Sequence, residues 1–173
     1  MLKSNVKNIY LIGAMGVGKT TIGKQLALTT GIPFKDSDLE IETATGASIP
    51  LIFEVEGEAG FRKRETEMIA KLTQETPLIL ATGGGVILAK PNRQHLIKQG
   101  MVIYLRASLN ELLERTRHHK NRPLLQTENP RARFQKILTE REPLYLETAD
   151  WVLDTENKSV KMIVHEIIQY TRT

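Results

Sequence analysis

The chain contains no cysteine, few aromatic residues and no long hydrophobic run, and each absence excludes a class of protein. Without cysteine there are no disulfide bonds and no cysteine-ligated metal sites. Aromatic residues make up 5% of the sequence, and no basic stripe is interleaved with them, as stacking of nucleic-acid bases would require. No apolar segment reaches membrane-spanning length, and the first residues lack a secretory signal. We therefore predict a cytoplasmic protein that binds neither nucleic acid nor membrane.

The size and charge of the chain narrow the possibilities further. Its 173 residues suit one domain with a sizeable core, and no repeat, low-complexity segment or linker divides them. We predict a single domain over residues 1–173. The formal net charge of +4 favours small anionic ligands, although a solvated basic surface would produce the same total.

Short apolar runs alternate with longer helical patterns along the chain. Five runs without polar alternation are typical of strands buried on both faces of a parallel sheet. They are Asn8–Gly13, Ile32–Asp38, Leu78–Ala81, Met101–Arg106 and Trp151–Asp154. Helical patterns cover Lys19–Thr30, Arg62–Gln74, Pro91–Gln99, Ser108–Arg117, Arg131–Arg141 and Ser159–Tyr170. A further helix is expected to begin near Ser48. The alternation predicts an α/β fold with three α/β/α layers around a doubly wound, five-stranded parallel sheet.

The segment GAMGVGKT, residues 13–20, has the Gly-x-x-x-x-Gly-Lys-Ser/Thr pattern of a phosphate-binding loop (P-loop) between a predicted strand and a predicted helix. Its glycines let backbone N–H groups surround phosphate oxygens, and the helix adds the positive end of its dipole. Lys19 supplies a charge for the β- and γ-phosphates, and Thr20 supplies a hydroxyl for Mg²⁺. The residues predicted to bind the nucleoside triphosphate are Gly13, Ala14, Met15, Gly16, Val17, Gly18, Lys19, Thr20 and Thr21.

Two aspartates, Asp36 and Asp38, lie at the carboxyl end of the second predicted strand. Ligands of open α/β sheets bind outside that end. Because residues two apart on a strand share a face, both carboxylates are expected to point into one crevice. One could act on the hydration shell of Mg²⁺, and the other could align or accept the proton of an attacking hydroxyl. The alternative is that Asp38 caps a helix beginning at Leu39.

Two arginines lie at positions where a buried helix face is expected. Arg62 lies beside an apolar stripe, and Glu65, three residues on, can hold its guanidinium in place. Arg141 continues the apolar face formed by Phe134 and Ile137, so it either reaches water at a helix end or meets an anion inside. Two convergent arginines would suit a small carboxylate, which accepts paired hydrogen bonds from a guanidinium.

Three consecutive glycines, Gly83–Gly85, follow the third predicted strand. Glycine is costly to order, so a run of three needs a reason, and the phosphate loop already accounts for the nucleotide phosphates. The alternative is a flexible turn before the helix at Pro91.

A polar, basic segment with two prolines, His118–Pro130, separates two helical patterns. Loops of this length in compact domains are usually functional, and we predict a mobile lid there. An ordinary surface loop is the alternative.

Together these motifs resemble those of shikimate kinases, within the nucleoside-monophosphate-kinase-like P-loop proteins. The resemblance runs over nearly the whole chain, in order, through GAMGVGKTT, DSDLEIE, GEAGFRKRE, LATGGGV, NRPLL and EREPLY. It implies a P-loop kinase with a lid at approximately residues 116–130 that transfers the γ-phosphoryl group of ATP to the 3-hydroxyl of shikimate. It further implies one Mg²⁺ ion, a monomer, and a place in the pathway to chorismate and aromatic amino acids.

The resemblance also implies roles for single residues. Catalysis would involve Lys19, Asp38 and Arg122, the last of these in the lid. Arg115 and Arg122 would join the phosphate loop in binding ATP, Arg115 by stacking on the adenine. The residues implied in binding shikimate are Asp38, Arg62, Gly83, Gly84, Gly85 and Arg141. Thr20 and Asp36 would hold Mg²⁺, although Thr82 with a water could replace Asp36 in the outer shell.

Three rival functions are weighed against this interpretation. A gluconate kinase would also need arginines for a carboxylate, but the combination of DSD, FRKRE and TGGG favours shikimate. A nucleotide-sensing module would not require Lys19, Asp38 and Arg122 together. An RNA-binding P-loop protein would need an extended basic patch, which the sequence does not show.

Overall fold

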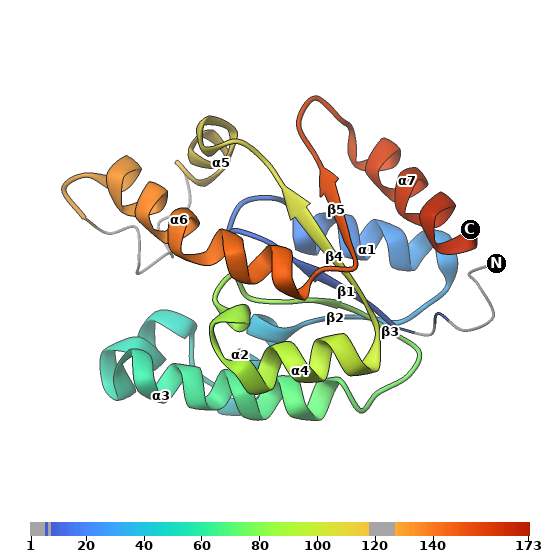
Figure 1. The fold of residues 1–173 in the computed structure, drawn as a ribbon. Coiled ribbons are helices and arrows are strands. Elements are labelled where there is room, and N and C mark those ends of the chain that lie inside the picture. The colour runs from blue at the N-terminus through green and yellow to red at the C-terminus, as the bar shows by residue number, and fades with distance from the viewer. Residues whose placement is uncertain (1–5, 7, 118–126) are drawn as a thin grey trace.

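The computed structural model describes residues 6, 8–117 and 127–173, and at its centre lies a five-stranded parallel sheet. The strand order is β2-β3-β1-β4-β5, so β1 lies in the middle (Figure 1). The strands are β1 (Asn8–Ile12), β2 (Phe34–Asp36), β3 (Leu78–Ala81), β4 (Met101–Arg106) and β5 (Trp151–Asp154). In register, Tyr10 pairs with Leu80 on one side and with Val102 on the other. The predicted five-stranded parallel sheet is confirmed.

Helices cover both faces of this sheet (Figure 1). The helices are α1 (Lys19–Thr30), α2 (Ser37–Thr45), α3 (Ile49–Leu72), α4 (Lys90–Gln99), α5 (Leu109–Thr116), α6 (Pro130–Thr148) and α7 (Val160–Arg172), with the short 3-10 helix η1 (Val86–Leu88). Successive residues of β1 point to opposite faces. Ile9 and Leu11 pack with α1 and α7, whereas Tyr10 and Ile12 pack with α3, α4 and the C-terminal half of α6. This arrangement confirms the three α/β/α layers.

Helices α3 and α6 are longer than the sequence predicts. Helix α3 begins at Ile49, after the N-cap Ser48, and continues through the predicted helix at Arg62. A single residue with φ 72° and ψ 178°, Gly57, kinks it, and glycine adopts that conformation at little cost. Helix α6 continues seven residues past its predicted end at Arg141, because its buried residues extend to Thr148. Within the described ranges, every helix is too short or too polar to cross a membrane.

Candidate active site

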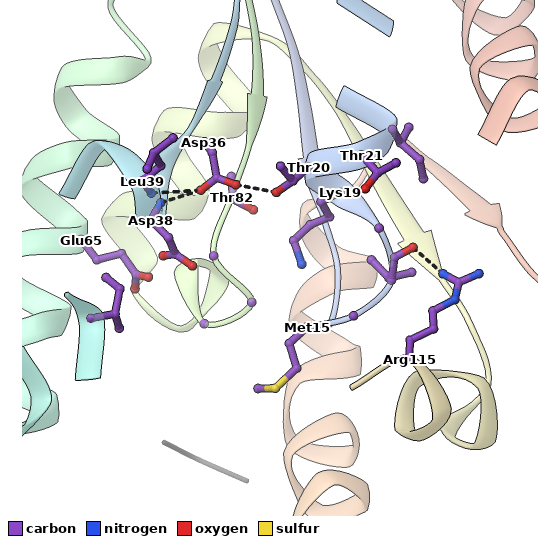
Figure 2. A pocket seen from close by; sticks show the side chains of 18 of the residues that line it. Met15, Lys19, Thr20, Thr21, Asp36, Asp38, Leu39, Glu65, Thr82 and Arg115 are labelled. Carbon is purple, nitrogen blue, oxygen red and sulfur yellow. Dashed lines mark hydrogen bonds between the residues drawn. The ribbon is translucent and has the colours of Figure 1, made fainter. Parts of the chain in front are cut away.

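A cavity of about 970 Å³ opens at the carboxyl edge of the sheet, where β1, β2 and β3 end (Figure 2). Most of the predicted site residues line it, although they come from distant parts of the chain. They are Met15, Gly16, Val17, Gly18, Lys19, Thr20, Thr21, Asp36, Asp38, Arg62, Gly83, Gly84, Gly85, Arg115 and Arg141. Gly13 and Ala14 do not line the cavity but contact Lys19. Arg122 and most of the predicted lid lie outside the described residues.

The phosphate loop joins β1 to α1, and its backbone requires glycine at two positions inside the cavity. Gly16 has φ 83° and Gly18 has φ 102°, in the left-handed region that side chains disfavour. A Cβ atom on Gly16 would lie 2.5 Å from the Cγ2 atom of Thr116. Gly18 is also the N-cap of α1, and it has no side chain to occupy the helix N-terminus. The first N–H groups of α1 are therefore available to an anion in the cavity.

Lys19 is buried at the start of α1, with 8% of its surface exposed. Its Nζ atom donates hydrogen bonds to the carbonyl oxygens of Gly13 at 2.6 Å and Ala14 at 2.9 Å. These carbonyls compensate part of the cost of burying an ammonium group. The loop thus holds a positive charge at its centre, next to the helix N-terminus.

Asp36 connects the phosphate loop to α2 (Figure 2). Its Oδ1 atom caps α2 by accepting from the backbone N–H groups of Asp38 at 2.9 Å and Leu39 at 3.2 Å. Its Oδ2 atom accepts a hydrogen bond from the Thr20 hydroxyl at 2.5 Å. The helix cap is therefore Asp36, and the alternative that Asp38 provides it is wrong.

The sequence pattern predicts that Asp38 lies at the end of a strand. In the structure it lies in the first turn of α2. Strand β2 ends at Asp36, because the cap starts the helix at once. Both carboxylates still line the same cavity. The expected crevice is confirmed, but a helix turn rather than strand alternation places Asp38 in it.

Thr20 and Asp36 are the predicted Mg²⁺ residues, and their geometry fits that role. The Thr20 hydroxyl points its proton at Asp36, which leaves the oxygen lone pairs for a cation. The competing residue Thr82 donates its hydroxyl proton to the carbonyl of Leu11 at 2.9 Å. In the part of the chain that the structure describes, no group of three or more acidic, histidine or cysteine residues could hold a metal. Sparse protein ligands suit Mg²⁺, which keeps its waters and binds substrate phosphates.

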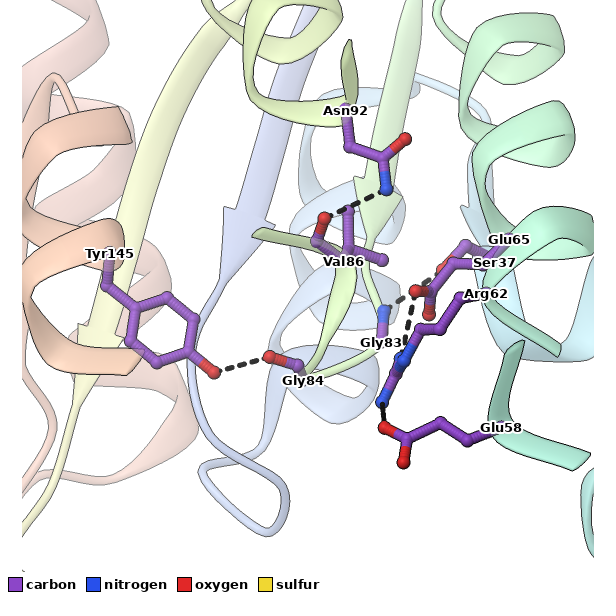
Figure 3. A network of polar contacts seen from close by, with 9 residues as sticks. All are labelled: Ser37, Glu58, Arg62, Glu65, Gly83, Gly84, Val86, Asn92 and Tyr145. Carbon is purple, nitrogen blue, oxygen red and sulfur yellow. Dashed lines mark hydrogen bonds and ion pairs between the residues drawn. The ribbon is translucent and has the colours of Figure 1, made fainter. Parts of the chain in front are cut away.

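Glu65 also lines the cavity, and it holds Arg62 in place (Figure 3). The Arg62 Nη1 atom donates to Glu65 Oε1 at 2.9 Å, which confirms the contact expected from their spacing. Glu65 is 1% exposed, and burial raises its pKa to about 7. Arg62 lowers this pKa, but less than burial raises it, and the charge of Asp38 raises it further. Sequence reasoning recognised Glu65 as a support for Arg62 but not as a residue of the cavity.

Arg141 points inward rather than to water, which decides between the two alternatives that its spacing left open. It is 6% exposed on α6, and burial lowers the pKa of its guanidinium. A buried guanidinium requires hydrogen-bonding or charged partners. Arg62 and Arg141 reach the cavity from opposite sides, α3 and α6, and both line it.

The triple glycine lies between these two arginines. A Cβ atom on Gly85 would lie 2.4 Å from Arg62 Nη1, and one on Gly83 would lie 2.7 Å from Asp38 Oδ1. The Gly83 N–H group donates to the Ser37 hydroxyl at 3.0 Å (Figure 3). Bare backbone is needed here because side chains would displace the charged groups that line the cavity. The loop is therefore more than a flexible turn.

Arg115 of α5 is anchored to the phosphate loop (Figure 2). Its Nη1 atom donates to the carbonyl oxygen of Val17 at 2.8 Å, and its Nη2 atom pairs with Glu111. These contacts bring its guanidinium plane to the nucleotide end of the cavity. Stacking of Arg115 on an adenine remains a prediction.

A phosphate loop and a separate, arginine-lined pocket within one cavity of a parallel α/β sheet define a small P-loop kinase. The family model "Shikimate kinase" matches residues 15–172. A shikimate kinase from Methylococcus capsulatus is 56% identical over 164 residues, which cover 95% of this chain and 92% of that protein. A shikimate kinase from Nitrosococcus oceani is 52% identical over 165 residues, which cover 95% of this chain and 87% of that protein.

Solved structures agree with these sequence matches. The structure of a shikimate kinase from Acinetobacter baumannii, in complex with shikimate, is similar with a TM-score of 0.94 and 48% identity. The match covers 96% of this chain and 93% of that chain. The chain belongs to the shikimate kinase family, and it is a shikimate kinase enzyme.

Proposed function

We propose that ATP and shikimate bind side by side in this cavity, and that the γ-phosphoryl group passes to the 3-hydroxyl of shikimate. One observation carries the proposal: two inward-facing arginines and a triple glycine share a cavity with a phosphate loop. Phosphoryl transfer depends mainly on alignment and charge stabilisation. A cavity that holds donor and acceptor together supplies that alignment.

The shikimate carboxylate is assigned to Arg62 and Arg141. Arg141 is 6% exposed and the Arg62 side chain is 21% exposed, and the ion pair with Glu65 fixes Arg62 before substrate arrives. Paired hydrogen bonds from a guanidinium to a carboxylate give both affinity and direction. The backbone of Gly83–Gly85 would face the substrate ring, where side chains would take its volume.

Asp38 is assigned to the reacting hydroxyl. Asp38 lies next to Gly83 of the glycine loop. It also neighbours Asp36, which contacts the phosphate-loop residue Thr20. From that place its carboxylate can orient the hydroxyl of shikimate and accept the proton as the new P–O bond forms. The order of these two events does not alter the assignment.

The triphosphate is assigned to the phosphate loop, with Lys19 beside the β- and γ-phosphates. Thr20 and Asp36 would hold Mg²⁺, which neutralises charge on the phosphate oxygens when it is bound. Arg122 is proposed to add a positive charge from the lid, a role predicted from the sequence alone. Activity as a monomer in the cytoplasm is likewise proposed from the family resemblance, and sedimentation tests the monomer.

ADP release from MgATP tests the proposal when it is measured without acceptor, with gluconate, with shikimate and with shikimate methyl ester. Shikimate alone should stimulate release strongly, and the ester should be a poor substrate because it lacks the carboxylate charge. A Lys19→Met variant provides the blank. Equal rates with shikimate and its ester would refute the roles of Arg62 and Arg141. Phosphorus NMR of the product identifies the hydroxyl that was phosphorylated.

A further inference from the structure

Tyr145 of α6 has a buried hydroxyl group to which none of the roles above assigns a function. Its side chain is 1% exposed, and the hydroxyl donates a hydrogen bond to the carbonyl oxygen of Gly84 at 2.6 Å (Figure 3). Gly84 is the central residue of the triple glycine. A side chain from α6 is therefore bonded directly to the backbone that lines the cavity.

The same hydroxyl also interacts with the charge of the Arg141 guanidinium. The two residues lie four apart on one helix, a spacing that puts side chains next to each other, and each of them shifts the pKa of the other. Gly84 and Arg141 are also close to each other, since a Cβ atom on Gly84 would lie 3.6 Å from Arg141 Nη1. The Gly84 carbonyl, the Tyr145 hydroxyl and the Arg141 guanidinium thus form one contact cluster.

Donor and acceptor chemistry fixes the direction of these interactions. A guanidinium can only donate, and a carbonyl oxygen can only accept. The phenol therefore donates its single proton to Gly84, and only the lone pairs of its oxygen are left to face Arg141. Burial raises the pKa of Tyr145 to about 12, so the proton stays in place across the physiological range.

The ring that carries this hydroxyl is held by its neighbours. Tyr104 of β4 stacks on it with ring centroids 4.8 Å apart and an angle of 14° between the planes. The Tyr104 hydroxyl bonds Glu142 of α6, which fixes the stacked ring in turn. Tyr145 thus has little freedom to swing away from Gly84 and Arg141.

We propose that Tyr145 is a positioning residue for shikimate. Its hydroxyl fixes the position of the Arg141 guanidinium relative to the Gly84 carbonyl. It touches neither substrate itself and acts through the two groups that do. The inference rests on the proposed roles of Arg141 and the glycine loop. It predicts that loss of a single hydroxyl weakens shikimate binding and leaves the nucleotide half of the cavity as it was.

The test is Tyr145→Phe, which keeps the ring and its stacking and removes only the hydroxyl. Tyr10→Phe is the matched control, because Tyr10 is also buried and its hydroxyl accepts a hydrogen bond from Asn8 at 3.1 Å, at the opposite end of the sheet. Steady-state kinetics gives kcat and both KM values for each enzyme. Isothermal titration calorimetry gives the Kd of shikimate without turnover.

We expect Tyr145→Phe to raise the KM and Kd of shikimate roughly five- to tenfold, with kcat and the KM of ATP within about twofold of the wild type. Tyr10→Phe should change none of these. On an Arg141→Ala background the same substitution should raise the KM of shikimate by less than about twofold, because its effect passes through Arg141.

Two results would overturn the inference: a shikimate KM and Kd unchanged by Tyr145→Phe, or an equal rise in the KM of ATP, which a general loosening of the fold would produce. Both results can be distinguished from the result expected if the proposed function itself is wrong. In that case Arg141→Ala itself would leave the KM of shikimate unchanged, and the basis of the inference would be lost with it.

Discussion

The buried carboxyl group of Glu65 should make the stability of the ligand-free protein fall as pH rises from about 4.5 to about 7. This side chain is 1% exposed and accepts a hydrogen bond from Arg62 at 2.9 Å. Burial destabilises the charged carboxylate more than Arg62 stabilises it, so the pKa of Glu65 rises from 4.5 to about 7. Since one pKa unit corresponds to about 1.4 kcal/mol, ionising Glu65 costs the folded state about 3 kcal/mol relative to the unfolded state.

The sign follows from proton binding. Between pH 4.5 and about 7 the folded protein keeps a proton on Glu65 that the unfolded chain has lost. The free energy of unfolding therefore falls with rising pH across this window; the contribution is complete below it and lost above it. A Glu65→Gln variant keeps the shape and is neutral at every pH. Its free energy of unfolding, relative to the wild type, should increase by about 3 kcal/mol between about pH 4.5 and about pH 8.

Urea unfolding followed by Trp151 fluorescence measures this difference at a series of pH values. Comparing the two proteins cancels the histidines, which titrate in both. Glu67→Gln is the control, because Glu67 is an exposed glutamate of the same helix. A difference between Glu65→Gln and the wild type that stays constant with pH would refute the reasoning, since Glu65 would then ionise equally in both states.

Three further predictions concern the two halves of the cavity and the predicted lid. Gly85→Ala places a Cβ atom 2.4 Å from Arg62 Nη1, so the KM of shikimate should rise about tenfold or more while the KM of ATP stays constant; equal changes in both would contradict the assignment. Asp36→Asn removes the charge that faces the Thr20 hydroxyl, and kinetics at varied Mg²⁺ should show a higher Mg²⁺ requirement, whereas an unchanged requirement would exclude Asp36 from the metal site. Arg122→Ala should lower kcat by orders of magnitude with little effect on melting temperature, and full turnover would refute the lid role.

Much of the fold could be predicted because its signals are local. Continuous apolar runs such as Leu78–Ala81 indicate strands covered on both faces, and this strand forms with the predicted ends. The helix after β2 was less visible, since its starting signal is the Asp36 side chain, which lies inside the run predicted to be a strand, Ile32–Asp38. Helix α6 continues through Pro143 because burial of Tyr145 and Thr148 outweighs the local preference of proline to end a helix.

The sequence by itself determined the phosphate loop, the alternation of strands and helices, and the pairing of Arg62 with Glu65, because each depends on residues close together in the chain. Only the tertiary structure decided that Arg141 faces inward, since spacing along a helix does not reveal what packs against its end. It also decided the place of Tyr145, which lies 61 residues from Gly84 in the chain and bonds to it directly. Contacts of that kind leave no periodic signal, because they arise where elements distant in sequence meet at one edge of the sheet.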